Sequence, residues 1–215
     1  MSGAAVAWAA LYDAASLAFA YPDDRFYRSL QDDSFANLLT DNLSRITAGA
    51  ALAAAGKTLG AAADTIKDRD RLALETEYVS LFEMGREKNV LHLHAHLYDR
   101  QRREQFALLR QLSALYAEFG LSLAPFPGRE APDHITVQLE FMSYLWRLWD
   151  QASTGEPAFP AAMLRDGIQR FHRELGWIPT FAARLAAISG HPFYVPLAGF
   201  TAAMVQTPPV AGIVP

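Results

Sequence analysis

Residues 135–150 constrain the fold of this chain most, because their polar and apolar side chains separate onto two faces of a helix. Apolar positions cover so wide an arc that this helix should contact two or more neighbouring elements. Polar side chains recur at steps of three and four residues, the spacing of one helical face. They are Asp133, Thr136, Glu140, Ser143, Arg147 and Asp150. The pattern predicts a core helix with one continuous polar stripe.

The residues in front of this segment predict how the helix begins. Pro132 suits the first helical position, because the amide hydrogen that proline lacks would have no partner there. Asp133 would then lie in the first turn, where the helix dipole favours an anion. We therefore expect Pro132, Asp133 and His134 to form an exposed, polar edge at the mouth of the helix.

Helical spacing recurs along the rest of the chain, and no segment shows a convincing strand alternation. In residues 4–20 the large apolar side chains follow a helical repeat, which favours a packed first helix over a secretory signal. Residues 48–63 are rich in alanine, so we expect a weakly packed helical connector. Further helices are expected over residues 64–82, 94–119, 163–175, 180–188 and 193–204. The prediction is an all-α bundle of roughly eight to ten helices.

Length and composition are those of a globular protein, built as one large domain or as two closely packed halves. The 215 residues can bury one sizeable core. We expect a helical domain over residues 1–206, with a possible internal hinge near residues 121–132. Residues 207–215 are expected to form a flexible tail. The absence of cysteine excludes disulfides and thiolate metal sites. A net charge of −4 argues against nucleic-acid binding, and no run reaches the roughly 20 uncharged apolar residues of a membrane span. We expect a cytosolic protein, monomeric by default.

Glu130, Pro132, Asp133, His134 and Glu140 form the densest group of polar and titratable side chains. Three interpretations remain open for them. They could only start the helix, they could supply a carboxylate and an imidazole for acid–base catalysis, or they could hold a basic, partly apolar peptide. No nucleophile, metal-ligand set or phosphate-binding loop accompanies them, so catalysis is the weaker use. Residue chemistry alone favours the role in starting the helix.

His92, His94 and His96 lie close together in the sequence. On a helix, His92 and His96 would share a face and could chelate a metal ion. No carboxylate occurs at the same spacing to complete a ligand set. We therefore interpret the three as surface or capping histidines, and we expect no metal site and no cofactor.

Three segments, in this order, resemble the TorD/DmsD/NarJ family of redox-enzyme maturation chaperones. Residues 77–82, followed by Gly85, are similar to the family's Tyr-x-x-Leu-Phe segment. Residues 130–134 resemble its Glu-x-Pro-Asp-His signature, with residues 140–142 downstream as in many members. Its C-terminal helices and Pro-Phe-Tyr turn are matched by His172, Trp177, Phe181 and residues 190–194.

The resemblance implies an all-helical, non-enzymatic protein of the cytosol. Family members bind the N-terminal segment of a molybdenum oxidoreductase, often its twin-arginine leader, until the molybdopterin cofactor and partner subunits are in place. The expected partner is thus the apo catalytic subunit of such an enzyme, and a domain-swapped dimer is compatible with the family. Asp133 and His134 are expected to contact the peptide, while Glu130 and Pro132 shape the same loop. The other expected peptide-binding residues are Tyr78, Leu81, Phe82, Glu140 and Trp177.

The client itself stays open. Many members have a Pro- and Trp-rich stretch where this chain has residues 86–96, and residues 91–103 are similar to chaperones of selenate, chlorate, dimethylsulfide or ethylbenzene oxidoreductases. Two further classes also stay open: a helical metal-dependent hydrolase that uses the His/Asp/Glu cluster, and a permanent structural subunit of an oxidoreductase. On the chaperone interpretation, Asp133→Ala should weaken leader-peptide binding and leave the melting temperature nearly unchanged.

Overall fold

The computed structural model describes residues 2–47, 49–84, 91–98, 104–122, 130–155 and 158–208. Within these residues the chain forms ten α-helices and two short 3-10 helices, which confirms the predicted all-α fold. The elements of the first half are α1 (Ser2–Phe19), α2 (Asp24–Gln31), α3 (Ser34–Arg45), α4 (Ala50–Ile66), α5 (Arg71–Phe82) and η1 (Ala95–Leu97). Those of the second half are α6 (Gln105–Glu118), α7 (Ile135–Thr154), α8 (Ala161–Glu174), η2 (Leu175–Trp177), α9 (Ile178–Ile188) and α10 (Tyr194–Gln206).

Two expectations fall mostly outside these residues. The hinge was expected near residues 121–132, of which the structure does not describe residues 123–129. The tail was expected over residues 207–215, of which it does not describe residues 209–215. Both remain predictions.

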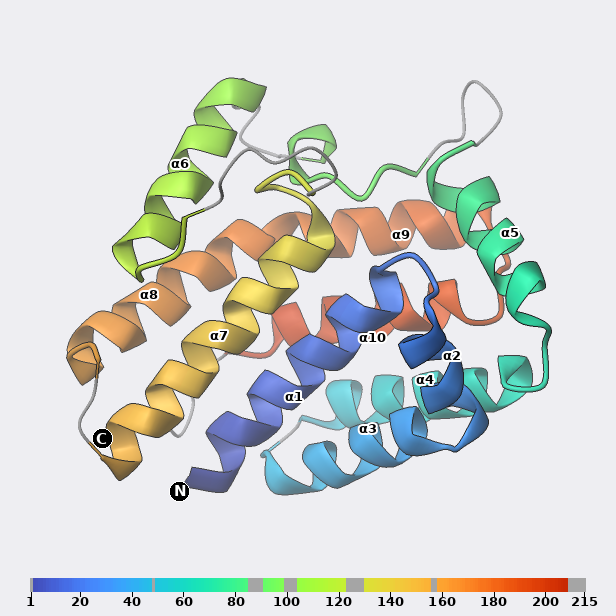
Figure 1. The fold of residues 1–215 in the computed structure, drawn as a ribbon, viewed down its shortest axis with the longest axis horizontal. Helices are drawn as coiled ribbons and strands as arrows, with labels where there is room; N and C mark the ends of the chain where they lie inside the picture. The colour runs from blue at the N-terminus through green and yellow to red at the C-terminus, as the bar shows by residue number, and fades with distance from the viewer. Residues whose placement is uncertain are drawn as a thin grey trace.

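Helices α1 and α7 lie along each other at the centre of the fold (Figure 1). Their aromatic side chains meet, and the rings of Trp8 and Trp146 stack with centroids 6.0 Å apart. Helix α8 also packs on α7, so α7 has the two neighbours that its wide apolar arc requires. The packed first helix is confirmed, because the apolar repeat of α1 is buried. Its members are Trp8, Leu11, Tyr12, Ala15 and Phe19.

The polar stripe of α7 is only partly exposed. Glu140 and Arg147 reach the surface, whereas Thr136 and Ser143 are buried. The hydroxyl of Ser16 in α1 donates to the backbone carbonyl of Thr136 at 3.1 Å and contacts the Glu140 carboxylate at 3.4 Å. Packing of α1 therefore covers part of the predicted polar stripe.

Two helix boundaries differ from expectation. The helix expected over residues 64–82 is interrupted, because α4 ends at Ile66 and a charged turn separates it from Arg71, where α5 begins. The helix expected over residues 94–119 is represented in the described residues by the single turn η1 and by α6, which begins at Gln105.

Helix α4 is well packed, which corrects the expectation of a weakly packed connector. It contacts α3 and α10, and Leu52, Leu59 and Ile66 are fully buried. Small residues make this possible, because they let helices approach closely. A Cβ atom at Gly56 would overlap the side chain of Leu43 in α3.

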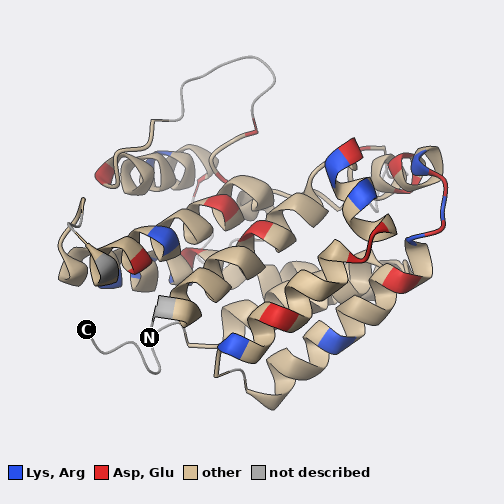
Figure 2. Ribbon diagram, turned by 60° about the horizontal axis from the view of Figure 1, so that its bottom comes forward, with Lys and Arg blue, Asp and Glu red and all other residues tan. Residues whose placement is uncertain are grey.

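The surface carries both signs of charge. Figure 2 shows Lys and Arg positions interspersed with Asp and Glu. Some of these side chains join neighbouring helices, as Arg170 of α8 does with Glu118 of α6 at 2.9 Å. In the part of the chain that is described, no single helix is long and apolar enough to cross a membrane.

Candidate functional site

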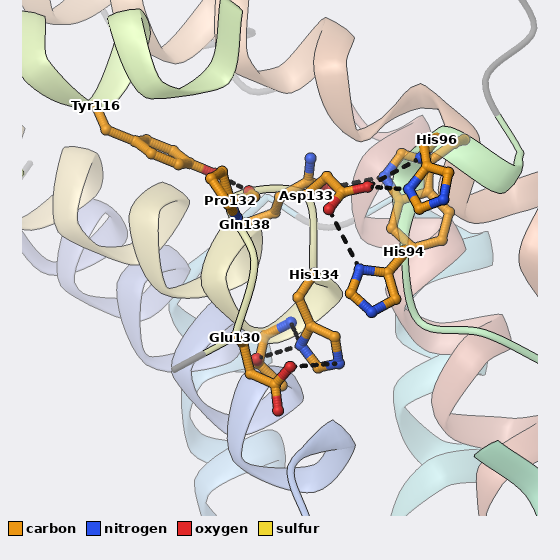
Figure 3. Close-up of polar contacts among 10 residues, drawn as sticks. His94, His96, Tyr116, Glu130, Pro132, Asp133, His134 and Gln138 are labelled. Carbon is orange, nitrogen blue, oxygen red and sulfur yellow. Dashed lines mark hydrogen bonds and ion pairs between the residues drawn. The ribbon is translucent and has the colours of Figure 1, made fainter. Parts of the chain in front are cut away.

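The turn in front of α7 is paired with residues 91–98 through the backbone. The amide of Ile135 donates to the carbonyl of Leu93 at 2.8 Å, and the amide of Ala95 donates to the carbonyl of Asp133 at 2.9 Å. These bonds flank an isolated antiparallel bridge between the two segments. The backbone therefore holds the side chains of this turn at fixed positions beside those of residues 91–98 (Figure 3).

The carboxylate of Asp133 is fully buried and accepts three hydrogen bonds. The Nδ1 of His94 donates to Oδ1 at 3.2 Å, while the Nδ1 and the amide of His96 donate to Oδ2 at 2.6 and 3.2 Å. Burial alone would raise the pKa of Asp133, but these hydrogen bonds outweigh it and lower the pKa to about 2. Because the ionised carboxylate can only accept, both imidazoles carry a proton on Nδ1, and Nε2 keeps its lone pair when each ring is neutral.

His134 is the N-cap of α7. Its Nδ1 accepts from the amide of Thr136 and lies 2.7 Å from the Thr136 hydroxyl. Burial, assisted by the nearby His94, lowers the pKa of His134 to about 4, so the ring is neutral at pH 7. Its Nε2 faces the carboxylate of Glu130 at 3.8 Å, which is longer than a hydrogen bond.

The prediction of an exposed edge at the start of this helix is wrong. Helix α7 begins at Ile135, because His134 supplies the cap and Pro132 and Asp133 form the turn in front of it. Asp133 is 0% exposed and His134 6% exposed. The hydroxyl of Tyr116 in α6 donates to the carbonyl of Pro132 at 2.6 Å and ties the turn to the body of the protein. Pro132 is half-buried, and only Glu130 of this signature is exposed.

Trp177 lies in the interior behind this turn. Its indole Nε1 donates to the Oε1 of Gln138 in α7 at 2.8 Å, and its ring stacks on Tyr98 with centroids 5.4 Å apart. Trp177 therefore joins α7 to the 91–98 segment rather than lining an open groove, as its expected role required. Glu140, by contrast, is exposed on α7.

The residues expected from the Tyr-x-x-Leu-Phe segment are mostly inside. Tyr78 and Phe82 are each 5% exposed, and their ring centroids lie 5.1 Å apart. The hydroxyl of Tyr78 donates to the carbonyl of Phe19 at 3.1 Å, which fixes α5 to the end of α1. Leu81 is half-buried, and its carbonyl accepts from the amide of Leu91 at 3.3 Å. This segment thus connects α5 to the core and to residues 91–98.

One edge of Tyr78 is surrounded by exposed residues. Burial raises the pKa of Tyr78, and the nearby carboxylates of Glu83 and Glu130 raise it further. The ring of Tyr21, which is 47% exposed, lies 5.6 Å from that of Tyr78, and Met84 beside Glu83 is 76% exposed. We call Tyr21, Tyr78, Glu83, Met84 and Glu130 the Tyr78 face. It brings together two residues expected from the resemblance and three that the sequence did not single out.

His94 and His96 are site residues whose role the sequence interpretation missed. His94 has extended backbone angles, φ −114° and ψ 129°, so His92 and His96 do not share a helical face. Instead, Leu91 and Leu93 point inward and His92 is exposed. The alternation of leucine and histidine, which is typical of an extended segment, was the available signal.

Two groups of side chains in this region have the geometry to hold a metal ion. One group is His94, His96 and Asp133, and the other is His94, Glu130 and His134. In each group the candidate ligand atoms lie within 4.8 Å of one another. The carboxylate that was missing from the histidine spacing is therefore supplied by the turn in front of α7.

Sequence comparison places these segments in a known family. The family described as nitrate reductase delta subunit matches residues 48–183, which include residues 77–82 and 130–134 but not residues 190–194. A chlorate reductase assembly chaperone protein from Ideonella dechloratans is 34% identical over 122 residues, covering 54% of this chain and 60% of that protein. A selenate reductase assembly chaperone protein from Thauera selenatis is 32% identical over 131 residues, covering 59% of this chain and 65% of that protein. The chain thus aligns with less than two thirds of each relative.

A solved structure supports the same fold. The crystal structure of a candidate redox enzyme maturation protein from Archaeoglobus fulgidus matches with a TM-score of 0.55, covering 93% of this chain and 94% of that chain at 21% identity. The resemblance noted in the sequence is therefore confirmed by the family match over residues 48–183. This chain belongs to the nitrate reductase delta subunit family, the NarJ/TorD-type group.

Proposed function

We propose that this protein is an assembly chaperone that binds the N-terminal region of a molybdenum oxidoreductase catalytic subunit. The observation that carries the proposal is the family match over residues 48–183, supported by two relatives named as assembly chaperones of chlorate and selenate reductases. The chaperone acts in the cytoplasm, catalyses no reaction, and keeps its client until cofactor and partner subunits are in place, before export. Family membership favours this role over the hydrolase alternative.

The Tyr78 face is the surface we propose for the client. A leader segment brings arginines and an apolar stretch, and the face offers the carboxylates of Glu83 and Glu130 beside the exposed side chains of Tyr21 and Met84. Opposite charges set the register and orientation of a bound peptide, while apolar contact supplies most of the affinity.

A groove between α1, α2 and α3 extends this surface. It has a volume of about 890 Å³, and Tyr21 lines it as well as contacting Tyr78. The groove has an apolar lining from Leu17, Phe35 and Leu38. Negatively charged aspartates and positively charged arginines border it. We propose that the apolar stretch of the client lies in this groove while its arginines lie on the Tyr78 face.

The residues expected from the resemblance then have different roles. Glu130, which is exposed, and Leu81, which is half-buried, are proposed to touch the client, with Glu140 as a further exposed carboxylate. Asp133 and His134 are buried, so we propose that they act indirectly, by fixing the turn that carries Glu130. The remaining expected residues are proposed to support this surface from inside; they are Pro132, Tyr78, Phe82 and Trp177.

The magnitudes suit a client that must be released. Exposed ion pairs contribute about 0.2–1 kcal/mol each. Each well-buried apolar side chain of the peptide contributes on the order of 1.5–3 kcal/mol. A few such contacts, offset by the ordering of the peptide, give reversible binding in the micromolar range.

Co-expression with the catalytic subunit of a molybdenum oxidoreductase from the same organism tests the function. We expect the chain to co-purify with the cofactor-free subunit and to be absent from the mature enzyme. A matched catalytic subunit without its N-terminal leader should not retain the chain. Failure to associate with the cofactor-free subunit would contradict the proposal, and presence in the mature complex would identify a structural subunit instead.

A further inference from the structure

His94, Glu130 and His134 come together from two segments that are joined by backbone hydrogen bonds. The hydrogen bonds from Ile135 to Leu93 and from Ala95 to Asp133 fix the two histidines, so no large movement of them is needed to assemble the group. Two imidazoles and one carboxylate are ligands that zinc and other divalent first-row metals accept.

We propose that His94, Glu130 and His134 bind one divalent transition metal ion of the zinc class. The ligand atoms are the Nε2 of His94, the Nε2 of His134 and a carboxylate oxygen of Glu130. Figure 3 shows the second ring nitrogen of His94 directed away from Asp133 and toward the ring of His134, and the two ring centroids lie 5.0 Å apart.

The distance between the His134 and Glu130 ligand atoms is close to that of a zinc site. Zinc bonds of about 2.1 Å at tetrahedral angles separate two ligand atoms by roughly 3.4 Å. The Nε2 of His134 and the Oε2 of Glu130 are 3.8 Å apart. The Glu130 side chain is 59% exposed and can rotate to close this difference.

Each imidazole has a partner on its other nitrogen, as metal-binding histidines usually do. The Nδ1–H of His94 donates to the buried carboxylate of Asp133, which leaves Nε2 available. When the Nε2 of His134 binds the ion, its proton moves to Nδ1, where the Thr136 hydroxyl at 2.7 Å can accept it. The ring stays neutral, no net proton is released at His134, and the 3.4 Å hydrogen bond from the Thr136 amide to Nδ1 is given up in exchange.

The second group, His94, His96 and Asp133, fits less well. There both imidazoles direct an Nδ1–H at the carboxylate, and the amide of His96 also donates to it. A metal ion would have to displace these protons from a fully buried carboxylate. In the proposed group, by contrast, Asp133 remains the outer partner of His94.

The ion would fasten the exposed Glu130 to the 91–98 segment and keep one position open. Zinc sites are usually tetrahedral, so three protein ligands leave one position for water. Glu130 also belongs to the Tyr78 face, so the ion would lie at the border of the proposed client surface. The metal site rests on the geometry of these three residues and is independent of the client proposal.

Titration of tag-free, chelator-treated protein with Zn²⁺ by calorimetry tests the site. We expect one ion per chain, and Co²⁺ bound in its place should show visible d–d absorption. Loss of an outer partner alone weakens metal binding by about 10–100-fold, so Glu130→Gln and His94→Gln should weaken it at least as much. Glu130 is exposed, and its variant should keep the wild-type melting temperature without metal.

His92→Gln is the matched control, because His92 is exposed in the same segment but lies outside both groups. Its affinity for Zn²⁺ should equal that of the wild type. The proposal is overturned if the wild type binds no Zn²⁺, if Glu130→Gln binds it as tightly as the wild type, or if His92→Gln loses binding to the same extent. Binding that survives Glu130→Gln and is lost in His96→Gln would assign the ion to the other group instead.

Discussion

Replacement of Asp133 by alanine should destabilise the protein, which reverses the expectation drawn from the sequence. The carboxylate is 0% exposed and accepts hydrogen bonds from His94 and His96. Folding lowers its pKa from 3.8 to about 2, and one pKa unit corresponds to about 1.4 kcal/mol. The interactions that favour the charged form therefore contribute about 2 kcal/mol.

Alanine removes these interactions and leaves their donors without an acceptor. His94 and His96 are partly exposed and can turn toward water, but the amide of His96 is fixed by the backbone of η1. The hydrogen bond from this amide is already among the interactions that lower the pKa. The total is therefore about 2 kcal/mol, which lowers the melting temperature of a domain of this size by about 4–8 °C.

Chemical denaturation of wild type and Asp133→Ala from pH 7 to pH 3 measures this effect, with Glu130→Gln as the exposed control. Because the folded pKa of Asp133 is depressed, its contribution is complete above pH 3.8 and is lost as the pH falls toward 2. The gap between wild type and variant should therefore be constant near neutrality and shrink below about pH 4. A variant within 0.5 kcal/mol of the wild type at pH 7 would refute the buried, hydrogen-bonded state of this carboxylate.

Three further substitutions test other parts of the structure. His134→Asn keeps an N-cap acceptor but removes a group whose pKa falls from 6.5 to about 4 on folding. Between pH 6.5 and pH 4 the wild type should lose about 3 kcal/mol of folding free energy that the variant keeps. The same pH dependence of stability in both proteins would contradict this. Gly167→Ala should cost about 1–3 kcal/mol, because its Cβ would clash with the buried ring of Phe119; an unchanged denaturation midpoint would refute the close packing. A Cβ atom at Gly60 in α4 would meet open space. Gly60→Ala should therefore raise the free energy of unfolding by about 0.5–1 kcal/mol. A lower free energy of unfolding would argue against a helix at this position.

The helical content could be predicted from the sequence because helical spacing is a local property. The repeat in residues 135–150 predicted α7 and its wide buried arc, and the repeat of α1 predicted a packed helix. Side-chain volume was less informative. The alanine-rich residues 48–63 looked weakly packed, yet the lack of a side chain at Gly56 leaves room for Leu43 of α3, and α4 also packs on α10.

The site could be found in the sequence but its geometry could not. Residues 130–134 carry the family signature, so the location was predictable. The burial of Asp133 depends on donors from His94 and His96, which are 39 and 37 residues away in the chain. Such a non-local contact has no periodic signal, and the cap formed by His134, which sets the start of α7 at Ile135, was not predicted either.

The most direct test of the proposed function is calorimetric titration of the leader peptide of the cognate catalytic subunit. We predict micromolar binding to the wild type that weakens at high salt. Each of Glu83→Gln and Glu130→Gln should reduce the affinity by about 1.4- to 5-fold, the equivalent of one exposed ion pair. Glu118→Gln is the control, because α6 and α5 lie on opposite sides of the fold (Figure 1). Absence of peptide binding, or equal affinities for all four proteins, would contradict the assignment of the Tyr78 face as the client surface.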